Sequence, residues 1–175
     1  ASAGYYTTAC PRSSGHSGAD NRNVKDLRLA VYQPDIAPNL GAILRICACF
    51  GVPLDVIEPC GFPLSDKSLR RVAMDYAGQA DFSRHDSWSD FVTLTRPPRL
   101  ILLTTKAETD IWDFDFRADD TLMMGRESAG VPDDVHHACD GHVRIPMPGG
   151  GRSLNVAVAA GIVLAEALRQ IRGSN

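Results

Sequence analysis

The sequence lacks a long apolar run and has too few cysteines for a disulfide-held fold. Its longest apolar stretch covers residues 156–165 and ends at Glu166, whereas a membrane-spanning helix needs about 20 apolar residues. The five cysteines include no C-x-x-C pair and no Cys/His set with zinc-finger spacing, so we expect free thiols in a reducing cytosol and no metal site. The amino-terminal residues also lack the features of a secretory signal. We therefore expect a cytoplasmic protein without a membrane span.

An excess of charge of one sign is also absent. The formal net charge is −3 and the sequence pI is near 5.9, so any nucleic-acid site must be a local basic patch. The length of 175 residues, 44% of them hydrophobic, fits one compact domain with a sizeable core. Residues 1–26 are polar and show no apolar periodicity. We expect a flexible amino-terminal arm followed by one domain at residues 27–172.

Strand and helix patterns alternate along this domain. Apolar runs predict short strands at residues 27–31, 54–58, around 82, 100–104, 122–124 and 143–147. Helical spacing predicts helices at residues 38–50, from 65 to about 76, from 88, from 132, and from 154 to about 171. This alternation indicates an α/β fold with a mostly parallel sheet and helices on both faces.

Single residues predict several helix boundaries. Gly51 is a stop signal for the first helix, and Ser153 is the expected cap of the last one. Ser87 and Asp90 resemble a capping box. The helix that they open should bury three apolar residues, Trp88, Phe91 and Val92.

Motifs for several ligand classes are missing. A dinucleotide site would have G-x-G-x-x-G after the first strand, where this chain has Gln33 and Pro34. Gly125 and Gly130 have the glycine spacing of a P-loop, but its Lys and Ser/Thr are replaced by Val and Pro. There is also no H-E-x-x-H or G-x-S-x-G motif. These absences disfavour dinucleotide enzymes, ATPases and metal- or serine-dependent hydrolases.

Three loops in the second half of the chain lie where open α/β sheets bind ligands, at the carboxyl ends of strands. They cover residues 104–106, 125–130 and 148–153, and the last two contain several glycines. Glycine lets backbone amides and carbonyls approach a ligand, which suits an uncharged base or an amino-acid moiety. Such turns are also common as plain connectors, so the loops alone do not decide between a site and a connection.

Three ordered motifs resemble those of the SPOUT methyltransferases. They are N-L-G-A-I-L-R at residues 39–45, G-R-E-S-A-G at 125–130, and I-P-M at 145–147 followed by S-L-N-V-A at 153–157. The compact layout, with I-E-P at 57–59 and L-R-R at 69–71, is most similar to the tRNA wobble-nucleotide 2'-O-methyltransferases. The resemblance covers residues 27–171. It departs from the pattern at Arg126, often a proline, and at Ala157, often a serine.

The resemblance implies a carboxyl-terminal trefoil knot that binds S-adenosylmethionine (SAM), a homodimer, and methyl transfer to the wobble ribose 2'-hydroxyl of tRNA. By motif position, the cofactor would contact Leu103, Thr104, Gly125, Ile145, Met147, Ser153 and Leu154. The reaction centre would contain Asn39, Arg45, Glu127 and Asn155.

Arg45 follows Gly41 by one helical turn, so its guanidinium can lie over the gap that this glycine leaves. Arginine keeps its proton, which favours phosphate binding and stabilisation of a developing alkoxide over proton removal. A basic cluster of Lys67, Arg70 and Arg71, with Arg84 as a further candidate, could bind the anticodon stem or could be plain solvated surface.

Two alternatives to wobble methylation stay open. The first is the same chemistry on another tRNA position or on ribosomal RNA. The second is a knotted protein that binds RNA or SAM without turnover, against which the joint presence of the four reaction-centre residues counts.

Overall fold

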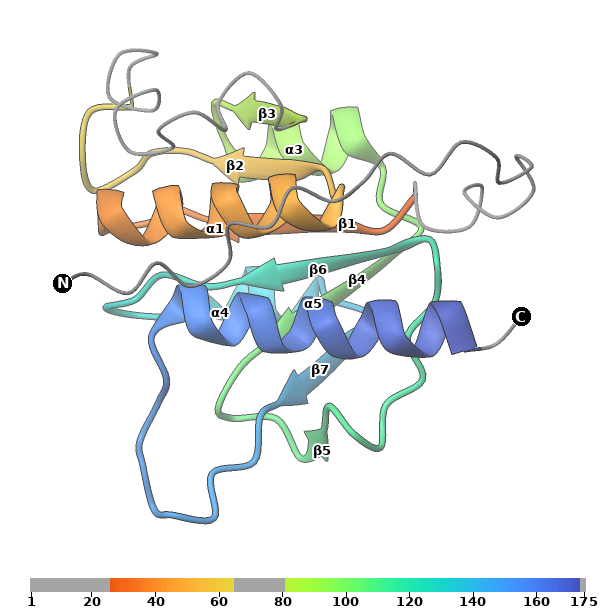
Figure 1. The fold of residues 1–175 in the computed structure, drawn as a ribbon. Helices are drawn as coiled ribbons and strands as arrows, with labels where there is room; N and C mark the ends of the chain where they lie inside the picture. The colour runs from red at the N-terminus through yellow and green to blue at the C-terminus, as the bar shows by residue number, and fades with distance from the viewer. Residues whose placement is uncertain (1–25, 65–80, 174–175) are drawn as a thin grey trace, which may run out of the picture.

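The computed structural model describes residues 26–64 and 81–173, and its centre is a seven-stranded sheet (Figure 1). The strand order is β3-β2-β1-β6-β4-β7-β5, and every paired neighbour is parallel. The strands are β1 (Arg28–Tyr32), β2 (Leu54–Ile57), β3 (Phe82–His85), β4 (Arg99–Leu103), β5 (Thr109–Asp110), β6 (Asp120–Met124) and β7 (Gly141–Arg144). The predicted parallel α/β class is confirmed. The short edge strand β5 was not predicted, because two residues carry no periodic pattern.

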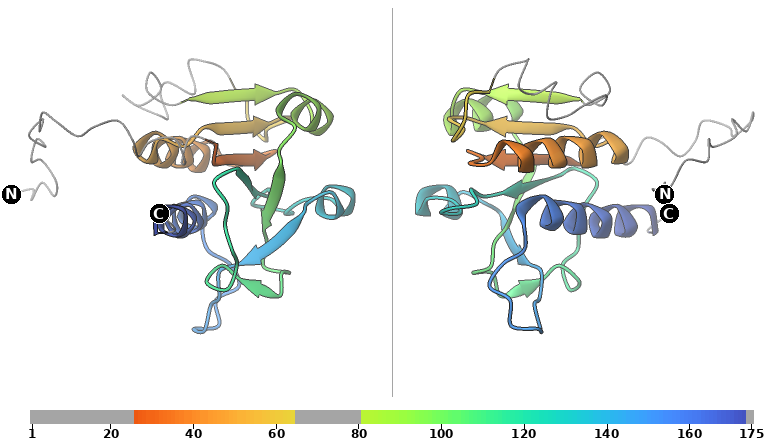
Figure 2. Two further views of the ribbon diagram at one scale, coloured as in Figure 1. Left: turned by 90° about the vertical axis from the view of Figure 1, so that its right-hand side faces the viewer. Right: turned by 60° about the vertical axis from the view of Figure 1, so that its left-hand side comes forward.

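Helices cover both faces of the sheet. They are α1 (Ala37–Phe50), α3 (Trp88–Thr95), α4 (Asp133–His137) and α5 (Val156–Gly173). Figure 2 shows α1 and α5 together on one face and α3 and α4 on the other. None of the helices within the described ranges is long and apolar enough to cross a membrane. The helix expected after Ser65 lies outside these ranges, as do residues 1–25 of the arm expected at residues 1–26.

The sheet is buried on both sides by two separate apolar clusters. The larger cluster packs α1 and α5 against the sheet and includes Leu40 and Leu164. The smaller one lies under α3 and α4 and includes Phe91 and Val135. Because central strands face a cluster on each side, they read as continuous apolar runs rather than alternating ones.

Two of the predicted helix boundaries are confirmed and one burial prediction is wrong. Gly51 ends α1 in the left-handed conformation, with φ of 69°, which glycine adopts without steric cost. Ser87 accepts a hydrogen bond from the Asp90 amide at the start of α3. Val92, predicted to be buried, is 40% exposed. In this short helix Phe91 occupies the position that faces the sheet, and its neighbour Val92 therefore points away.

The segment between β7 and α5 differs from the prediction at both ends. The strand expected at residues 143–147 is instead Gly141–Arg144, since Pro146 has no N–H for a strand ladder. The cap expected at Ser153 lies at Asn155, whose Oδ1 accepts from the amides of Ala157 at 2.9 Å and Val158 at 3.4 Å. A long loop therefore separates the last strand from the last helix.

The strand order brings distant segments together at one edge of the sheet. After β3 the chain crosses over to form β4, and β6 then fills the gap between β1 and β4. Because all strands are parallel, the segments that follow β1, β4, β6 and β7 meet at their carboxyl ends. This crossover is the place where open α/β sheets bind ligands.

Candidate active site

A cavity of about 500 Å³ lies at the carboxyl ends of β4, β6 and β7, between the first turns of α1 and α5. This volume falls within the range of about 300–1,000 Å³ for small-molecule sites. All seven residues predicted to contact a cofactor line this cavity: Leu103, Thr104, Gly125, Ile145, Met147, Ser153 and Leu154. The cavity therefore collects residues from all three loops singled out in the sequence.

The loop at residues 125–130 forms one wall of the cavity and closes on itself. Arg126 and Gly130 exchange two backbone hydrogen bonds, at 2.8 and 2.9 Å. Gly130 has φ of 68°, in the left-handed region. A Cβ on Gly125 would lie 2.9 Å from backbone atoms of Gly130. Only glycine fits at Gly125 unless the closed loop opens.

Asn39, Glu127 and Asn155 line the same cavity and form one chain of hydrogen bonds. The Asn39 Nδ2 donates to Glu127 Oε1 at 3.2 Å, and Asn155 Nδ2 donates to Asn39 Oδ1 at 2.9 Å. Glu127 Oε2 accepts from the Asp35 amide at 2.8 Å. Three of the four predicted reaction-centre residues are thus joined across the starts of α1 and α5 and the loop after β6.

The groups at the two ends of this series of hydrogen bonds determine the direction of each bond. A carboxylate only accepts, so Glu127 requires the NH₂ group of Asn39 on its side. The amides at the start of α5 only donate, so they require the carbonyl oxygen of Asn155. Asn155 must then present its NH₂ group to Asn39. Both asparagines are held in one orientation, and neither can be replaced by aspartate without placing two acceptors face to face.

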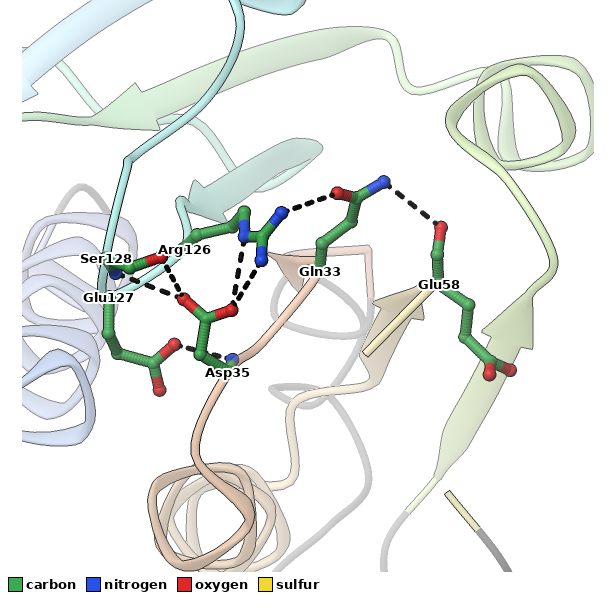
Figure 3. Close-up of polar contacts among 6 residues, drawn as sticks. All are labelled: Gln33, Asp35, Glu58, Arg126, Glu127 and Ser128. Atoms are coloured by element: carbon green, nitrogen blue, oxygen red, sulfur yellow. Dashed lines mark hydrogen bonds and ion pairs between the residues drawn. The ribbon is translucent and has the colours of Figure 1, made fainter. Parts of the chain in front are cut away.

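Asp35 joins the loop after β1 to this wall, and sequence analysis did not single it out (Figure 3). Its carboxylate accepts from Arg126 Nη2 at 2.7 Å and from Ser128 Oγ at 2.6 Å. Hydrogen bonds from Arg126 and Ser128 lower the pKa of Asp35 to about 2. The one signal in the sequence was Arg126 itself, an arginine at a position where the family pattern often has proline.

Among the other predicted site residues, two lie in the described part of the chain, and neither lines the cavity. Arg45 is exposed on α1 and is not among the residues that line the cavity. Arg84 donates through Nε and Nη2 to Glu58 Oε1, at 3.0 and 2.7 Å. The remaining basic residues, Lys67, Arg70 and Arg71, lie outside the described residues. Within the described ranges, no group of three or more His, Cys, Asp or Glu side chains could hold a metal ion.

A parallel α/β domain with a ligand-sized cavity at its crossover, lined by glycine backbone and by amide and carboxylate groups, is typical of the class of proteins that bind small organic ligands. Comparison with known families identifies the family within this class. The chain belongs to the SpoU rRNA methylase family, whose model matches residues 26–165. The resemblance to SPOUT methyltransferases inferred from the three motifs is confirmed.

Individual relatives agree with this assignment. The tRNA (cytidine(34)-2'-O)-methyltransferase of Beijerinckia indica subsp. indica is 55% identical over 145 residues, which cover 82% of this chain and 91% of that protein. A solved structure described as concerning 2-OH methylation of C/U34 on tRNA has a TM-score of 0.77 at 40% identity, covering 84% and 97% of the two chains. The SpoU methyltransferase AviRb from Streptomyces viridochromogenes, solved with AdoMet, has a TM-score of 0.74 at 30% identity, covering 90% and 66%.

Proposed function

We propose that this protein transfers a methyl group from SAM to the ribose 2'-hydroxyl of the wobble nucleotide, cytidine or uridine 34, of tRNA. The observation that carries the proposal is the match along almost the whole domain to a relative that bears this name, at 55% identity. The cavity, with its three-residue chain of amide and carboxylate groups, supplies a site of suitable size and chemistry.

The cavity fits SAM by its size and by the groups that line it. Apolar side chains of Leu103, Ile145, Met147 and Leu154 would cover an adenine base, and backbone groups of the loop at residues 125–130 would bind polar atoms of the cofactor. When bound, SAM supplies a methyl group on a sulfonium. Transfer of this group to a hydroxyl needs in-line placement of the hydroxyl and no metal. The contacts are proposed from the family motifs, and the use of SAM is supported by the structure of AviRb in complex with AdoMet.

We assign orienting roles to the three joined residues. Glu127 holds Asn39, and Asn39 holds Asn155 at the start of α5. The three polar side chains line the cavity beside the cofactor loops, where they can orient a ribose hydroxyl. Arg45, on the exposed side of α1, is proposed to bind an RNA phosphate and stabilise negative charge that develops on the attacking oxygen.

The RNA would reach this site along a basic surface. Lys67, Arg70 and Arg71 are proposed to contact phosphates of the anticodon stem-loop. A protein with a net charge of −3 needs such a local concentration of positive charge to bind RNA. Action on tRNA also implies a cytoplasmic location.

We further propose a homodimer that buries the outer faces of α1 and α5. Four large apolar residues are exposed at or next to these helices: Ile36, Phe50, Leu154 and Val158. Small residues accompany them, with Ala42 exposed on α1 and Ala165 on α5. A second copy of the same surface would cover this apolar area with twofold symmetry. The carboxyl-terminal trefoil knot of the family is proposed for the three loops at residues 104–106, 125–130 and 148–153.

The proposal is tested by incubating the protein with isotopically labelled SAM and tRNA that lacks wobble methylation, followed by nucleoside mass spectrometry and mapping. Label in 2'-O-methylcytidine or 2'-O-methyluridine at position 34 is expected. Label at another position would support the alternative of a related methyltransferase with a different RNA target. SAM binding without any product would support the non-catalytic alternative.

A further inference from the structure

The Asp35 carboxylate accepts four hydrogen bonds beside the cavity. Its Oδ1 accepts from Arg126 Nε at 3.2 Å and Nη2 at 2.7 Å, and its Oδ2 accepts from Ser128 N at 3.1 Å and Oγ at 2.6 Å. A carboxylate has about four acceptor sites, so these bonds use its whole capacity. Its backbone amide also donates to Glu127. Asp35, in the loop after β1, therefore holds residues 126–128 in the loop after β6.

Each nitrogen of the Arg126 guanidinium donates one hydrogen bond within the protein. Two of its nitrogens donate to Asp35, and the third, Nη1, lies 3.4 Å from Gln33 Oε1 (Figure 3). The Arg126 side chain is 35% exposed and that of Asp35 is 18% exposed. A guanidinium whose three nitrogens all face internal acceptors is poorly placed to bind an RNA phosphate. This arrangement assigns Arg126 an internal role, although it lines the cavity.

The segment that carries Asp35 is held in place from its other side. Gln33 has φ of 44°, an uncommon conformation for a residue with a side chain. Its amide donates to Ile57 at 2.8 Å. Gly61 donates to Pro34 at 2.9 Å, and a Cβ on Gly61 would lie 2.9 Å from the Asp35 Cα. The backbone of residues 33–35 is thus fixed against β2 and the segment after it, so Asp35 is a firm anchor.

We propose that Asp35 and Arg126 are positioning residues for methyl transfer. Their ion pair fixes the loop at residues 125–130 against the start of α1, which places Glu127 within reach of Asn39. Asn39 in turn determines the orientation of the Asn155 side chain. Neither residue contacts the reacting atoms in this proposal. The inference rests on the proposed function for its kinetic consequence, and on the hydrogen bonds alone for its structural one.

The test compares Arg126→Met and Arg126→Lys with Arg144→Met in the full chain. Arg144 pairs with Asp110 at 2.6 Å and similar exposure, and neither of these residues lines the cavity. We expect Arg126→Met to lower kcat about tenfold or more, since a small misplacement of catalytic groups is costly. The KM for tRNA and the Kd for SAM should change less than about twofold. Arg126→Lys should recover part of kcat, and Arg144→Met should match the parent.

A double-mutant cycle with Asp35→Asn separates positioning from independent effects. If the two residues act as one unit, the double variant has about the kcat of the worse single variant. The proposal would be overturned if the two single effects on kcat multiply in the double variant. It would also be overturned if folded Arg126→Met has a kcat within about twofold of the parent, or if only its KM for tRNA changes. If Arg126→Met does not fold, Arg126→Lys and Asp35→Asn carry the same comparison.

A second measurement does not depend on catalysis. The side-chain NH₂ resonances of Asn39 and Asn155 in ¹⁵N-edited NMR spectra should shift in Arg126→Met and stay unchanged in Arg144→Met. Unshifted resonances in Arg126→Met would overturn the positioning role. A parent protein that labels no tRNA while these resonances shift as expected would instead contradict the proposed function and leave the positioning contact supported.

Discussion

Asn155 makes two kinds of hydrogen bond with one side chain. Its oxygen caps α5, and its nitrogen donates to Asn39. Substitution by aspartate separates the cap from the hydrogen bond to Asn39, because aspartate is a good N-cap but has no side-chain N–H to donate. Because the cap of α5 is kept, we expect Asn155→Asp to lose less thermal stability than Asn155→Ala, while kcat falls about tenfold or more.

The matched control for this change is Asn155→Ala, which loses both contacts. It should lower the free energy of unfolding by about 1 kcal/mol, the usual cost of losing a cap, and lower kcat as well. Thermal unfolding and methyl-transfer kinetics on both variants separate the two effects. Unchanged kcat in Asn155→Asp would show that its hydrogen bond to Asn39 does not matter for the reaction.

Arg45 is tested by a change that keeps its charge. Lysine presents a compact ammonium in place of the planar guanidinium fork, so it cannot bind a phosphate in the same bidentate way. We expect Arg45→Lys to lose most methyl-transfer activity, measured with labelled SAM. Arg117→Lys, another exposed position away from the cavity, should be unaffected. If Arg45→Lys turns over at nearly the rate of the parent, the guanidinium of Arg45 has no role in the reaction.

At the scale of elements, the loop after β6 depends on close backbone contact. In Gly125→Ala the added Cβ would meet backbone atoms of Gly130 at 2.9 Å, a contact that a flexible side chain cannot relieve. The loop must open, which moves the cavity wall. We expect the Kd for SAM, measured by calorimetry, to rise about tenfold while the domain still folds.

A glycine in the neighbouring loop is the control for this change. A Cβ on Gly149 would meet no atom within 4 Å, and Gly149 does not line the cavity. Gly149→Ala should therefore bind SAM as the parent does. Equal affinity in both variants would show that closure of the 125–130 loop is unimportant for the cofactor.

At the scale of the whole molecule, oligomerisation can be tested on a single exposed valine. Val158 is 51% exposed on α5, on the face proposed to meet a second copy. A buried glutamate without a partner disfavours association, so Val158→Glu should be monomeric in analytical ultracentrifugation. Val92→Glu, at a valine 40% exposed on the opposite face of the sheet, should keep the oligomeric state of the parent. A monomeric parent protein would contradict the proposed dimer.

The sequence by itself determined the class of fold and predicted ten of the residues that line the cavity. Apolar runs and helical spacing predicted the strand and helix alternation, because burial on one or both faces imposes a period on each element. The family resemblance predicted seven of the residues that line the cavity, and three of the four predicted reaction-centre residues line it as well. These features are local, so neighbouring residues in the chain are enough to reveal them.

Only the tertiary structure decided which distant groups meet. Asp35 and Arg126 are 91 positions apart, and they pair because β6 enters the sheet between β1 and β4. Likewise, Asn155 and not Ser153 caps α5, since the loop before this helix is long enough to bring the Asn155 side chain to Asn39. The physical reason is the same in both cases: strand order and loop path place these partners, and neither is encoded in the local spacing of residues.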